Sequence, residues 1–260
     1  MELESVRNKV IEYTENVDLQ ELLSKSDLAF SENKIPKIIH FCFLDYMNMS
    51  EFHLNCLSTW FDILGDDWTF VNWTPRISEP VCEFETFVLQ ENKFAFYSDY
   101  MRVRKVWDYG GFYMDCDVVL YKDFSPLLDL DYAISSEFEK PYVEPAVFGA
   151  KRQNKFIGIL KDKYESCTQA DYEDNCISFL APVFWRNTLA SEGGVTVSFK
   201  SCKDIDKFRQ KINNETYNIM HTLDTSFLGC PHKTGFWTGT QMSPSENTFA
   251  SHMFAGTWSY

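Results

Sequence analysis

Hydrophobic residues recur at helical spacing near the start of the chain. Val6, Val10, Tyr13 and Val17 follow one another at intervals of three or four residues, and leucines continue this apolar stripe. Such intervals bring side chains to one face of a helix, and the intervening positions are mostly acidic. The pattern predicts a helix or helix pair in residues 1–33, packed as an appendage on the domain that follows.

Beyond residue 34, continuous apolar runs alternate with helical patterns. Residues 37–43 and 68–73 are typical of buried strands, whereas residues 54–61 and 96–107 have the spacing of amphipathic helices. Gly110 follows the second of these helices and ends it, and another apolar run begins at once. This β-α-β-α-β order predicts an open, mostly parallel sheet with right-handed crossovers.

The pattern weakens after residue 130. Residues 146–150 are apolar and predict one more strand. Residues 236–260 are rich in Gly, Ser, Thr and aromatic residues, which favours an ordered loop. Neither a repeat nor a composition shift divides the chain after residue 34, so we expect residues 34–260 to form a single α/β domain.

The strongest chemical signal is a pair of aspartates two residues apart. Asp115 and Asp117 lie in an apolar stretch after a glycine pair, which predicts a buried strand with both carboxylates on one face and Cys116 on the other. Neighbouring carboxylates repel each other and are costly to bury, so a hard divalent cation is the expected partner. An acidic strand end that faces water is the alternative.

Asp99 and Arg102 lie three residues apart on the predicted helix before this strand, and therefore on one face. An ordinary surface salt bridge is one interpretation. The other is that both residues face the same site as the aspartate pair, because the helix leads directly into that strand. In the second case Arg102 supplies positive charge for an anionic ligand.

The composition of the chain limits which molecules it is expected to bind. The net charge of −14 argues against nucleic acid and anionic membrane surfaces, since both need a basic footprint. Any anionic ligand must then be met by local Arg, Lys or metal. We expect no transmembrane segment, because no apolar run has the length of a span. Eight scattered cysteines without a CxxC pair favour a cytoplasmic protein, with peripheral membrane association as a variant.

The sequence lacks the motifs of several enzyme classes. The chain has no GxGxxG, Walker loop, HExxH or GxSxG sequence. The pattern Asp115-X-Asp117 also fits phosphatases of the haloacid dehalogenase superfamily, in which the first Asp is a nucleophile and the second a general acid. That motif normally lies on the first strand and precedes a Gly-Thr turn, whereas here it follows more than a hundred residues.

Four segments resemble, in order and spacing, glycosyltransferases with a DXD-containing sugar-binding region. They are IPKIIH (35–40), SDYMR (98–102), GGFYMDCD (110–117) and SHMFAGTW (251–258). The chain is most similar to glycosyltransferase family 32, which includes capsular-polysaccharide and α-mannosyl transferases, and more distantly to the glucosylating domains of clostridial toxins. The resemblance implies a GT-A fold, a Rossmann-like mixed sheet with helices on both faces.

The resemblance further implies a nucleotide-sugar donor, a Mn²⁺ or Mg²⁺ ion, and transfer that retains anomeric configuration. Asp117 would bind the metal directly, and Asp115 would contact the metal, directly or through water, and the donor ribose. Asp99 and Arg102 would hold the donor sugar and its diphosphate, which makes Arg102 catalytic together with the two DXD aspartates. His252 would complete the metal or diphosphate shell.

The resemblance also implies that Thr257 and Trp258 would close over the phosphates and that Phe43 would stack on the base. Many relatives have Trp where this chain has Phe43, and Leu44-Asp45 replaces a usual glycine. The base pocket can therefore differ from one that selects uracil, and Phe43 can instead be a residue of the strand core.

These features together predict a metal-dependent retaining glycosyltransferase. It would transfer a sugar from a UDP-sugar to a hydroxyl of a glycan, lipid-linked or protein acceptor, as in polysaccharide biosynthesis. Two alternatives remain: a GDP-mannose-dependent mannosyltransferase, and a catalytically silent protein that binds nucleotide-sugars or carbohydrates.

Overall fold

A computed structural model of the chain describes residues 1–77, 79–137, 142–192, 194–214, 219–228, 230–231 and 243–255. The α-helices in these residues are α1 (Leu3–Glu15), α2 (Leu19–Ser31), α3 (Glu51–Leu64), α4 (Glu83–Gln90), α5 (Phe94–Tyr109), α6 (Lys155–Ser166), α7 (Gln169–Asp174), α8 (Ala181–Ser191) and α9 (Ile205–Asn214). Short 3₁₀ segments occur at η1 (Tyr46–Asn48), η2 (Gly65–Asp67), η3 (Ser125–Leu127) and η4 (Cys176–Phe179).

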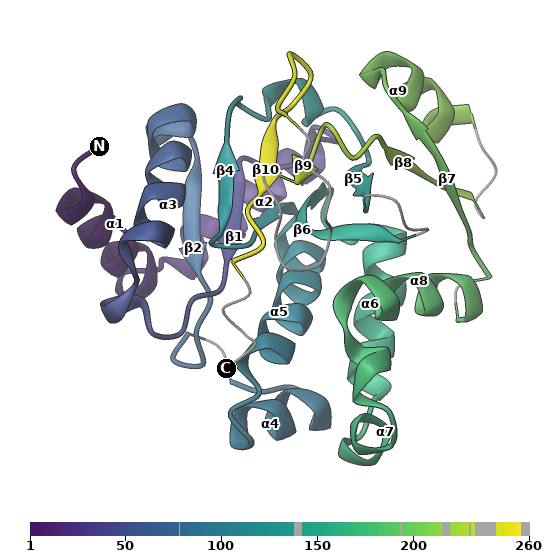
Figure 1. The fold of residues 1–260 in the computed structure, drawn as a ribbon, viewed down its shortest axis with the longest axis horizontal. Helices are drawn as coiled ribbons and strands as arrows, with labels where there is room; N and C mark the ends of the chain where they lie inside the picture. The colour runs from purple at the N-terminus through teal and green to yellow at the C-terminus, as the bar shows by residue number, and fades with distance from the viewer. Residues whose placement is uncertain are drawn as a thin grey trace.

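The strands form two sheets. The larger has the order β2-β1-β3-β6-β5-β8-β7 and consists of β1 (Ile38–Phe41), β2 (Thr69–Asn72), β3 (Gly111–Met114), β5 (Tyr132–Ser136), β6 (Val143–Ala150), β7 (Thr196–Cys202) and β8 (Ile219–Leu223). The smaller has the order β4-β10-β9, from β4 (Val118–Leu120), β9 (Cys230–Pro231) and β10 (Ala250–His252). Figure 1 shows β4 and β10 side by side.

In the described residues the main sheet is mixed but mostly parallel, as predicted, because four of its strand pairs are parallel and two are antiparallel. β1 is parallel to β2 and β3, but β6 is antiparallel to both β3 and β5. β5 and β6 are separated by only a few residues, too few for a parallel crossover, so they pair as a hairpin. The predicted strand at 146–150 is confirmed, and it begins earlier, at Val143.

Helices cover both faces of this sheet, as the alternation of strand side chains shows. In β1, the His40 ring lies beside Tyr109 of α5, and the Phe41 ring meets Trp60 of α3. Successive strand residues point to opposite faces. Thus α5 and α3 flank β1 from the two sides, with α1 beyond α3 in Figure 1.

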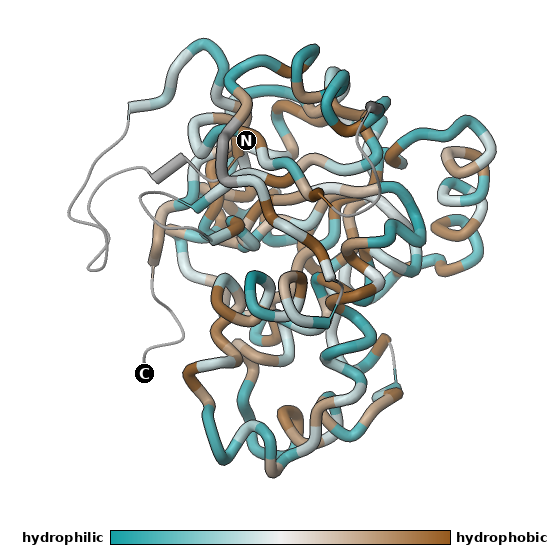
Figure 2. Tube along the Cα trace, turned by 90° about the vertical axis from the view of Figure 1, so that its right-hand side faces the viewer, coloured by the Kyte–Doolittle hydropathy of each residue, from teal (hydrophilic) through white to brown (hydrophobic). Residues whose placement is uncertain are grey.

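The predicted helix pair before residue 33 is confirmed by α1 and α2. Both helices reach the core, because Val6, Val10 and Leu22 are at most 1 % exposed and belong to the same hydrophobic cluster as the strands. Hydrophobic stretches run through the middle of the molecule in Figure 2, with hydrophilic stretches around them. The division into residues 1–33 and 34–260 stays a prediction.

Two local expectations are wrong. Asp115 and Asp117 do not lie within a strand, because β3 ends at Met114 and a turn closed by the Val118 N–H and the Asp115 carbonyl (3.0 Å) precedes β4. The tail is not wholly loop, because residues 250–252 form β10, which pairs antiparallel with β4. The rest of the tail up to residue 242, and residues 256–260, are outside the described residues.

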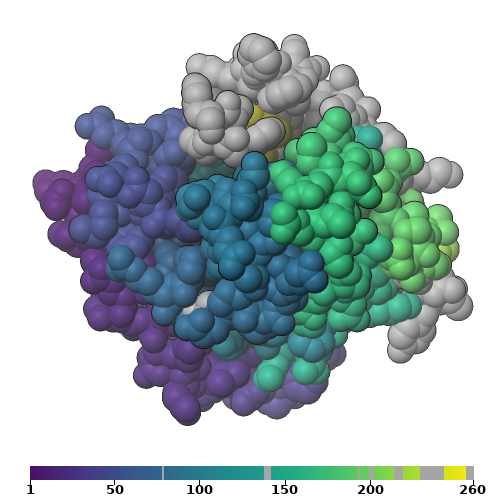
Figure 3. Space-filling view, turned by 90° about the horizontal axis from the view of Figure 1, so that it is seen from below, coloured from purple at the N-terminus to yellow at the C-terminus, as the bar shows by residue number. Residues whose placement is uncertain are grey.

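Seen from below, the surface passes from the N-terminal elements across α4 and α5 to the α6–α8 region (Figure 3). α5 contacts α6, and α4 contacts both. None of the helices in the described residues has the length and apolar character needed to cross a membrane.

Candidate active site

Three side chains meet at the end of β3, and one of them comes from the distant C-terminal segment. Asp115 and Asp117 stand in the β3–β4 turn, and β10 pairs His252 with Val118, directly beside that turn. One potential ligand atom from each of Asp115, Asp117 and His252 lies within 4.8 Å of the others. Although the strand expectation was wrong, the turn still brings both carboxylates together.

Asp117 is held mainly by the C-terminal segment. Its Oδ2 accepts the backbone N–H of Ala255 (2.8 Å), its carbonyl accepts that of Met253 (3.0 Å), and its Oδ1 lies 3.4 Å from His252 Nε2. Burial alone would raise the pKa of Asp117, but His252 and the Ala255 N–H outweigh burial and lower it to about 2. Asp117 is therefore ionised at neutral pH.

Arg102 reaches the same place from α5 and is only 5 % exposed. Its Nη2 lies 2.6 Å from Asp99 Oδ1 and 3.2 Å from Asp115 Oδ1, and its Nη1 donates to the Pro145 carbonyl at 2.9 Å. The guanidinium also lies over the Tyr113 ring, 4.6 Å from its centroid. The surface salt bridge proposed as an alternative is thus wrong: the pair is buried and faces the aspartate turn.

Asp115 differs from Asp117 in its partners. Its Oδ1 accepts the Tyr113 hydroxyl at 2.8 Å in addition to the Arg102 contact, and its Oδ2 accepts Arg102 Nη1 at 3.3 Å. Burial raises the pKa of Asp115, with Arg102 opposing the shift. Burial likewise raises the pKa of Asp99 to about 6, again against the effect of Arg102.

Phe43 lies two residues beyond the end of β1 and is half-buried, so it is not a residue of the strand core. Asn72, the last residue of β2, holds its backbone: Asn72 Oδ1 accepts the Phe43 N–H (2.8 Å) and Asn72 Nδ2 donates to its carbonyl (3.0 Å). The Phe43 ring lies 5.0 Å from that of His53. Its stacking on a base stays a prediction, and Thr257 and Trp258 lie outside the described residues.

Three residues near the cluster were missed in the sequence. The Tyr113 hydroxyl donates to Asp115, and Glu144 lies behind His252. Burial lowers the pKa of His53 on α3, and the nearby Asp117 carboxylate partly opposes that shift. Only Glu144 carried a signal, as an acidic residue inside an apolar strand. Its contact with His252 could not be inferred from the sequence, because Glu144 and His252 come together only through the long-range pairing of strands.

The cluster has an excess of negative charge. Four carboxylates, from Asp99, Asp115, Asp117 and Glu144, face the guanidinium of Arg102 and the imidazole of His252. Burial alone would lower the pKa of His252, but Asp117 and Glu144 raise it well above its usual value. Even with His252 protonated, the carboxylates outnumber the cations by two, so the donor set fits a divalent cation.

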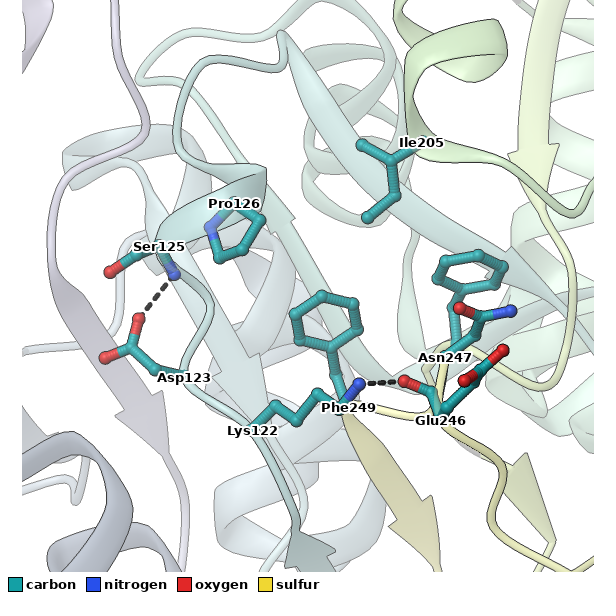
Figure 4. Close-up of a pocket in the computed structure, with 9 residues that line it drawn as sticks. Lys122, Asp123, Ser125, Pro126, Ile205, Glu246, Asn247 and Phe249 are labelled. Atoms are coloured by element: carbon teal, nitrogen blue, oxygen red, sulfur yellow. Dashed lines mark hydrogen bonds between the residues drawn. The ribbon is translucent and has the colours of Figure 1, made fainter.

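A separate cavity of about 480 Å³ lies at the other end of the β4–β10 pair (Figure 4). Lys122 and Phe249, just beyond the ends of those strands, are in its lining, and Lys122 donates to the Glu246 carbonyl. The residues that line it include none of the predicted site residues. The candidate active site is therefore the carboxylate cluster and not this cavity.

Comparisons with known proteins bear on the class of protein. Residues 8–134 match the family of glycosyltransferase sugar-binding regions containing a DXD motif. Two sequences in that segment have the DXD spacing, Asp115-Cys116-Asp117 and Asp129-Leu130-Asp131, and the first of them lies at the carboxylate cluster. No curated protein sequence matches the chain. Among solved structures, the chain is similar to the PaToxG glycosyltransferase, with a TM-score of 0.50 and 16 % identity over 73 % of this chain and 79 % of that one.

The fold and the motif define a glycosyltransferase with a GT-A-like fold. Residues 8–134 are similar to DXD-containing glycosyltransferase regions, and the protein is a transferase. The predicted resemblance to DXD glycosyltransferases is confirmed at this level.

Proposed function

We propose that the protein is a metal-dependent, retaining glycosyltransferase that uses a UDP-sugar as donor and the hydroxyl of a glycan, lipid-linked or protein molecule as acceptor. The observation that carries the proposal is the convergence of Asp115, Asp117 and His252 within 4.8 Å. The DXD family match and the GT-A-like fold support a nucleotide-sugar donor.

The residues present fit Mn²⁺ or Mg²⁺. Asp117 is ionised and would be a direct ligand, with His252 contributing an imidazole nitrogen. Asp115 already accepts three hydrogen bonds or ion-pair contacts from Tyr113 and Arg102, so little of its lone-pair capacity is left. Contact through water therefore suits Asp115 better than direct ligation. When bound, the cation would neutralise charge on the departing nucleoside diphosphate.

Arg102 would act mainly by holding the carboxylates. Each nitrogen of its guanidinium already donates to a protein acceptor: Nε to the Ser98 carbonyl, Nη1 to Asp115 and Pro145, and Nη2 to Asp99. A direct contact with the donor diphosphate requires one of these bonds to open. Asp99 uses Oδ1 for Arg102, so its second oxygen would accept a hydroxyl of the donor sugar.

Phe43 would contribute its ring to the donor base. Both polar groups of its backbone are bonded to Asn72, so the ring alone is left for recognition. Aromatic stacking tolerates any base, because every base has a π face. Stacking on Phe43 therefore does not distinguish UDP from GDP. We propose UDP as the donor nucleotide from the resemblance alone, and a GDP-mannose donor is an outcome that the assay below would reveal.

The test is nucleotide release from UDP- and GDP-sugars, measured with Mn²⁺ and with EDTA. We expect Mn²⁺-dependent release of UDP by the wild-type protein. Asp117→Asn should lower the rate roughly a hundredfold or more, because losing several kcal/mol of transition-state stabilisation costs about a factor of ten per 1.4 kcal/mol.

Asp66→Asn is the matched control, because the side chain of Asp66 is fully exposed on η2. This variant should release UDP at the wild-type rate. Equal turnover by Asp117→Asn and the wild type, or release that is unaffected by EDTA, would contradict the proposed site.

A further inference from the structure

Glu144 is a buried acid that the DXD motif does not account for. It lies on β6, is 3 % exposed, and its Oε1 accepts the backbone N–H of Ala146 at 2.9 Å. A buried carboxylate is costly unless donors or cations compensate it. In the part of the chain that the structure describes, the other polar group that meets this carboxylate is the imidazole of His252.

His252 has the complementary requirement. Its Nε2 points to Asp117 at 3.4 Å, whereas its Nδ1 is buried and makes no hydrogen bond. Glu144 Oε1 lies 3.6 Å from Nδ1, too far for a hydrogen bond but within ion-pair range. The buried Glu144 carboxylate and the buried Nδ1 of His252 thus face each other. Each can offset the cost of burying the other.

The backbone around Glu144 also supports the rest of the site. The Ala146 N–H binds the Glu144 carboxylate, and the Ala146 carbonyl accepts the Asp115 N–H at 2.8 Å. The Pro145 carbonyl between them accepts Arg102. Residues 144–146 of β6 therefore connect His252, Arg102 and Asp115 to one rigid strand in the middle of the main sheet.

We propose that Glu144 is a positioning residue that fixes the His252 ring with Nδ1–H toward its own carboxylate and Nε2 toward the two DXD aspartates. The proposal rests on the metal-dependent function above. A carboxylate on one imidazole nitrogen sets the tautomer and makes the other nitrogen a better ligand. Glu144 itself touches neither the DXD carboxylates nor, in this proposal, the donor.

The experiment is a Mn²⁺ titration of the intact protein, with and without UDP, in which electron paramagnetic resonance measures free Mn²⁺. We expect Glu144→Gln to weaken Mn²⁺ binding roughly tenfold to a hundredfold. The double variant Glu144→Gln/His252→Ala should bind no more weakly than His252→Ala, because Glu144 acts only through the ring.

A spectroscopic readout separates positioning from general damage to the fold. Pulsed resonance should show ¹⁴N coupling to Mn²⁺ in the wild type, and this coupling should weaken in Glu144→Gln. Glu165→Gln makes the same chemical change at a carboxylate that accepts a hydrogen bond from Tyr100, away from the cluster, and should change neither affinity nor coupling. Thermal unfolding of every variant shows that each is folded.

The outcomes distinguish the two proposals. Wild-type affinity and unchanged ¹⁴N coupling in Glu144→Gln would overturn the role of Glu144 and leave the metal site standing. Additive losses in the double variant would also overturn it. No Mn²⁺ binding by the wild type, either with or without UDP, would overturn the metal-dependent function and this inference with it.

Discussion

Asp115 and Asp117 share one turn, yet their surroundings give them different properties. Asp117 accepts backbone N–H groups from the C-terminal segment and faces His252, so its pKa falls to about 2. Asp115 is bound to Arg102 and Tyr113, and burial raises its pKa. The difference explains why we propose direct ligation for the first and support through water for the second.

His40 lies on β1, is fully buried and has structural partners. The Trp73 indole donates to its Nδ1 at 3.0 Å, so the proton is on Nε2, which donates to the Gly110 carbonyl at 2.7 Å. Burial lowers the pKa of His40 from 6.5 to about 4, with the Gly110 bond opposing the shift. The folded protein therefore requires the neutral form of the His40 imidazole.

Stability should therefore rise with pH between about 4 and 6.5 through His40. In this window the unfolded chain binds a proton at His40 and the folded chain does not. The His40 contribution, roughly 3 kcal/mol in free energy of unfolding, is complete above pH 6.5 and lost as the pH falls to 4. Urea unfolding at a series of pH values measures it.

His40→Gln is the comparison, because an amide offers both a donor and an acceptor but does not titrate. Asp99 and Asp115, whose pKa values burial raises, contribute with the opposite sign in both proteins, so the difference between the two curves isolates His40. A variant with the same pH dependence as the wild type would show that the folded protein accommodates the charged ring.

At the scale of elements, the glycine pair before the DXD turn sets the path of β3. Gly111 has φ of +105°, and a Cβ there would lie 2.6 Å from the Ile38 carbonyl oxygen of β1. Gly65, with φ of +63°, has open space around it. A side chain at Gly111 would meet both backbone strain and a collision with β1, whereas a side chain at Gly65 would meet backbone strain alone.

We predict that Gly111→Ala destabilises the protein by more than about 3 kcal/mol, because strain and collision with β1 add. Gly65→Ala, the control, should cost only about 1–3 kcal/mol, the strain of a backbone conformation (φ +63°, ψ −160°) that is essentially confined to glycine. Free energies of unfolding in urea provide the comparison. Equal costs at the two positions would show that β1 and β3 can separate to admit the methyl group.

The elements also show what the sequence could and could not predict. Periodicity found α3, α5, β1 and β2, because each carries its own apolar pattern. β10 was missed, because three residues in a polar tail become a strand only by pairing with β4. The position of Glu144 behind His252 depends on the same long-range pairing, so no local pattern could reveal it.

At the scale of the molecule, the order of the four family segments predicted the class of enzyme and the meeting of Asp115, Asp117 and His252. The reason given from the residues alone, a strand with both aspartates on one face, was wrong. Arg102 contacts the same turn and Asp99 contacts Arg102, as one interpretation of their place on the helix before the turn predicted. Recognition of the family segments therefore predicted this grouping of residues better than periodicity did.

The N-terminal helices should be required for folding. Val6, Val10 and Leu22 are buried in the common core, and α1 contacts both α3 and β2. We predict that residues 34–260 alone do not unfold cooperatively, because removal of α1 and α2 exposes that apolar surface. Circular dichroism during heating measures this. A truncated chain with the melting temperature of the whole chain would identify residues 1–33 as a dispensable appendage.

We expect one divalent cation to bind between the DXD turn and β10. Anomalous diffraction from crystals grown with Mn²⁺ and UDP should show a manganese peak bounded by Asp117, His252 and the UDP diphosphate, with Asp115 directly or one water away. A refined complex with UDP bound and no manganese at that position would contradict it.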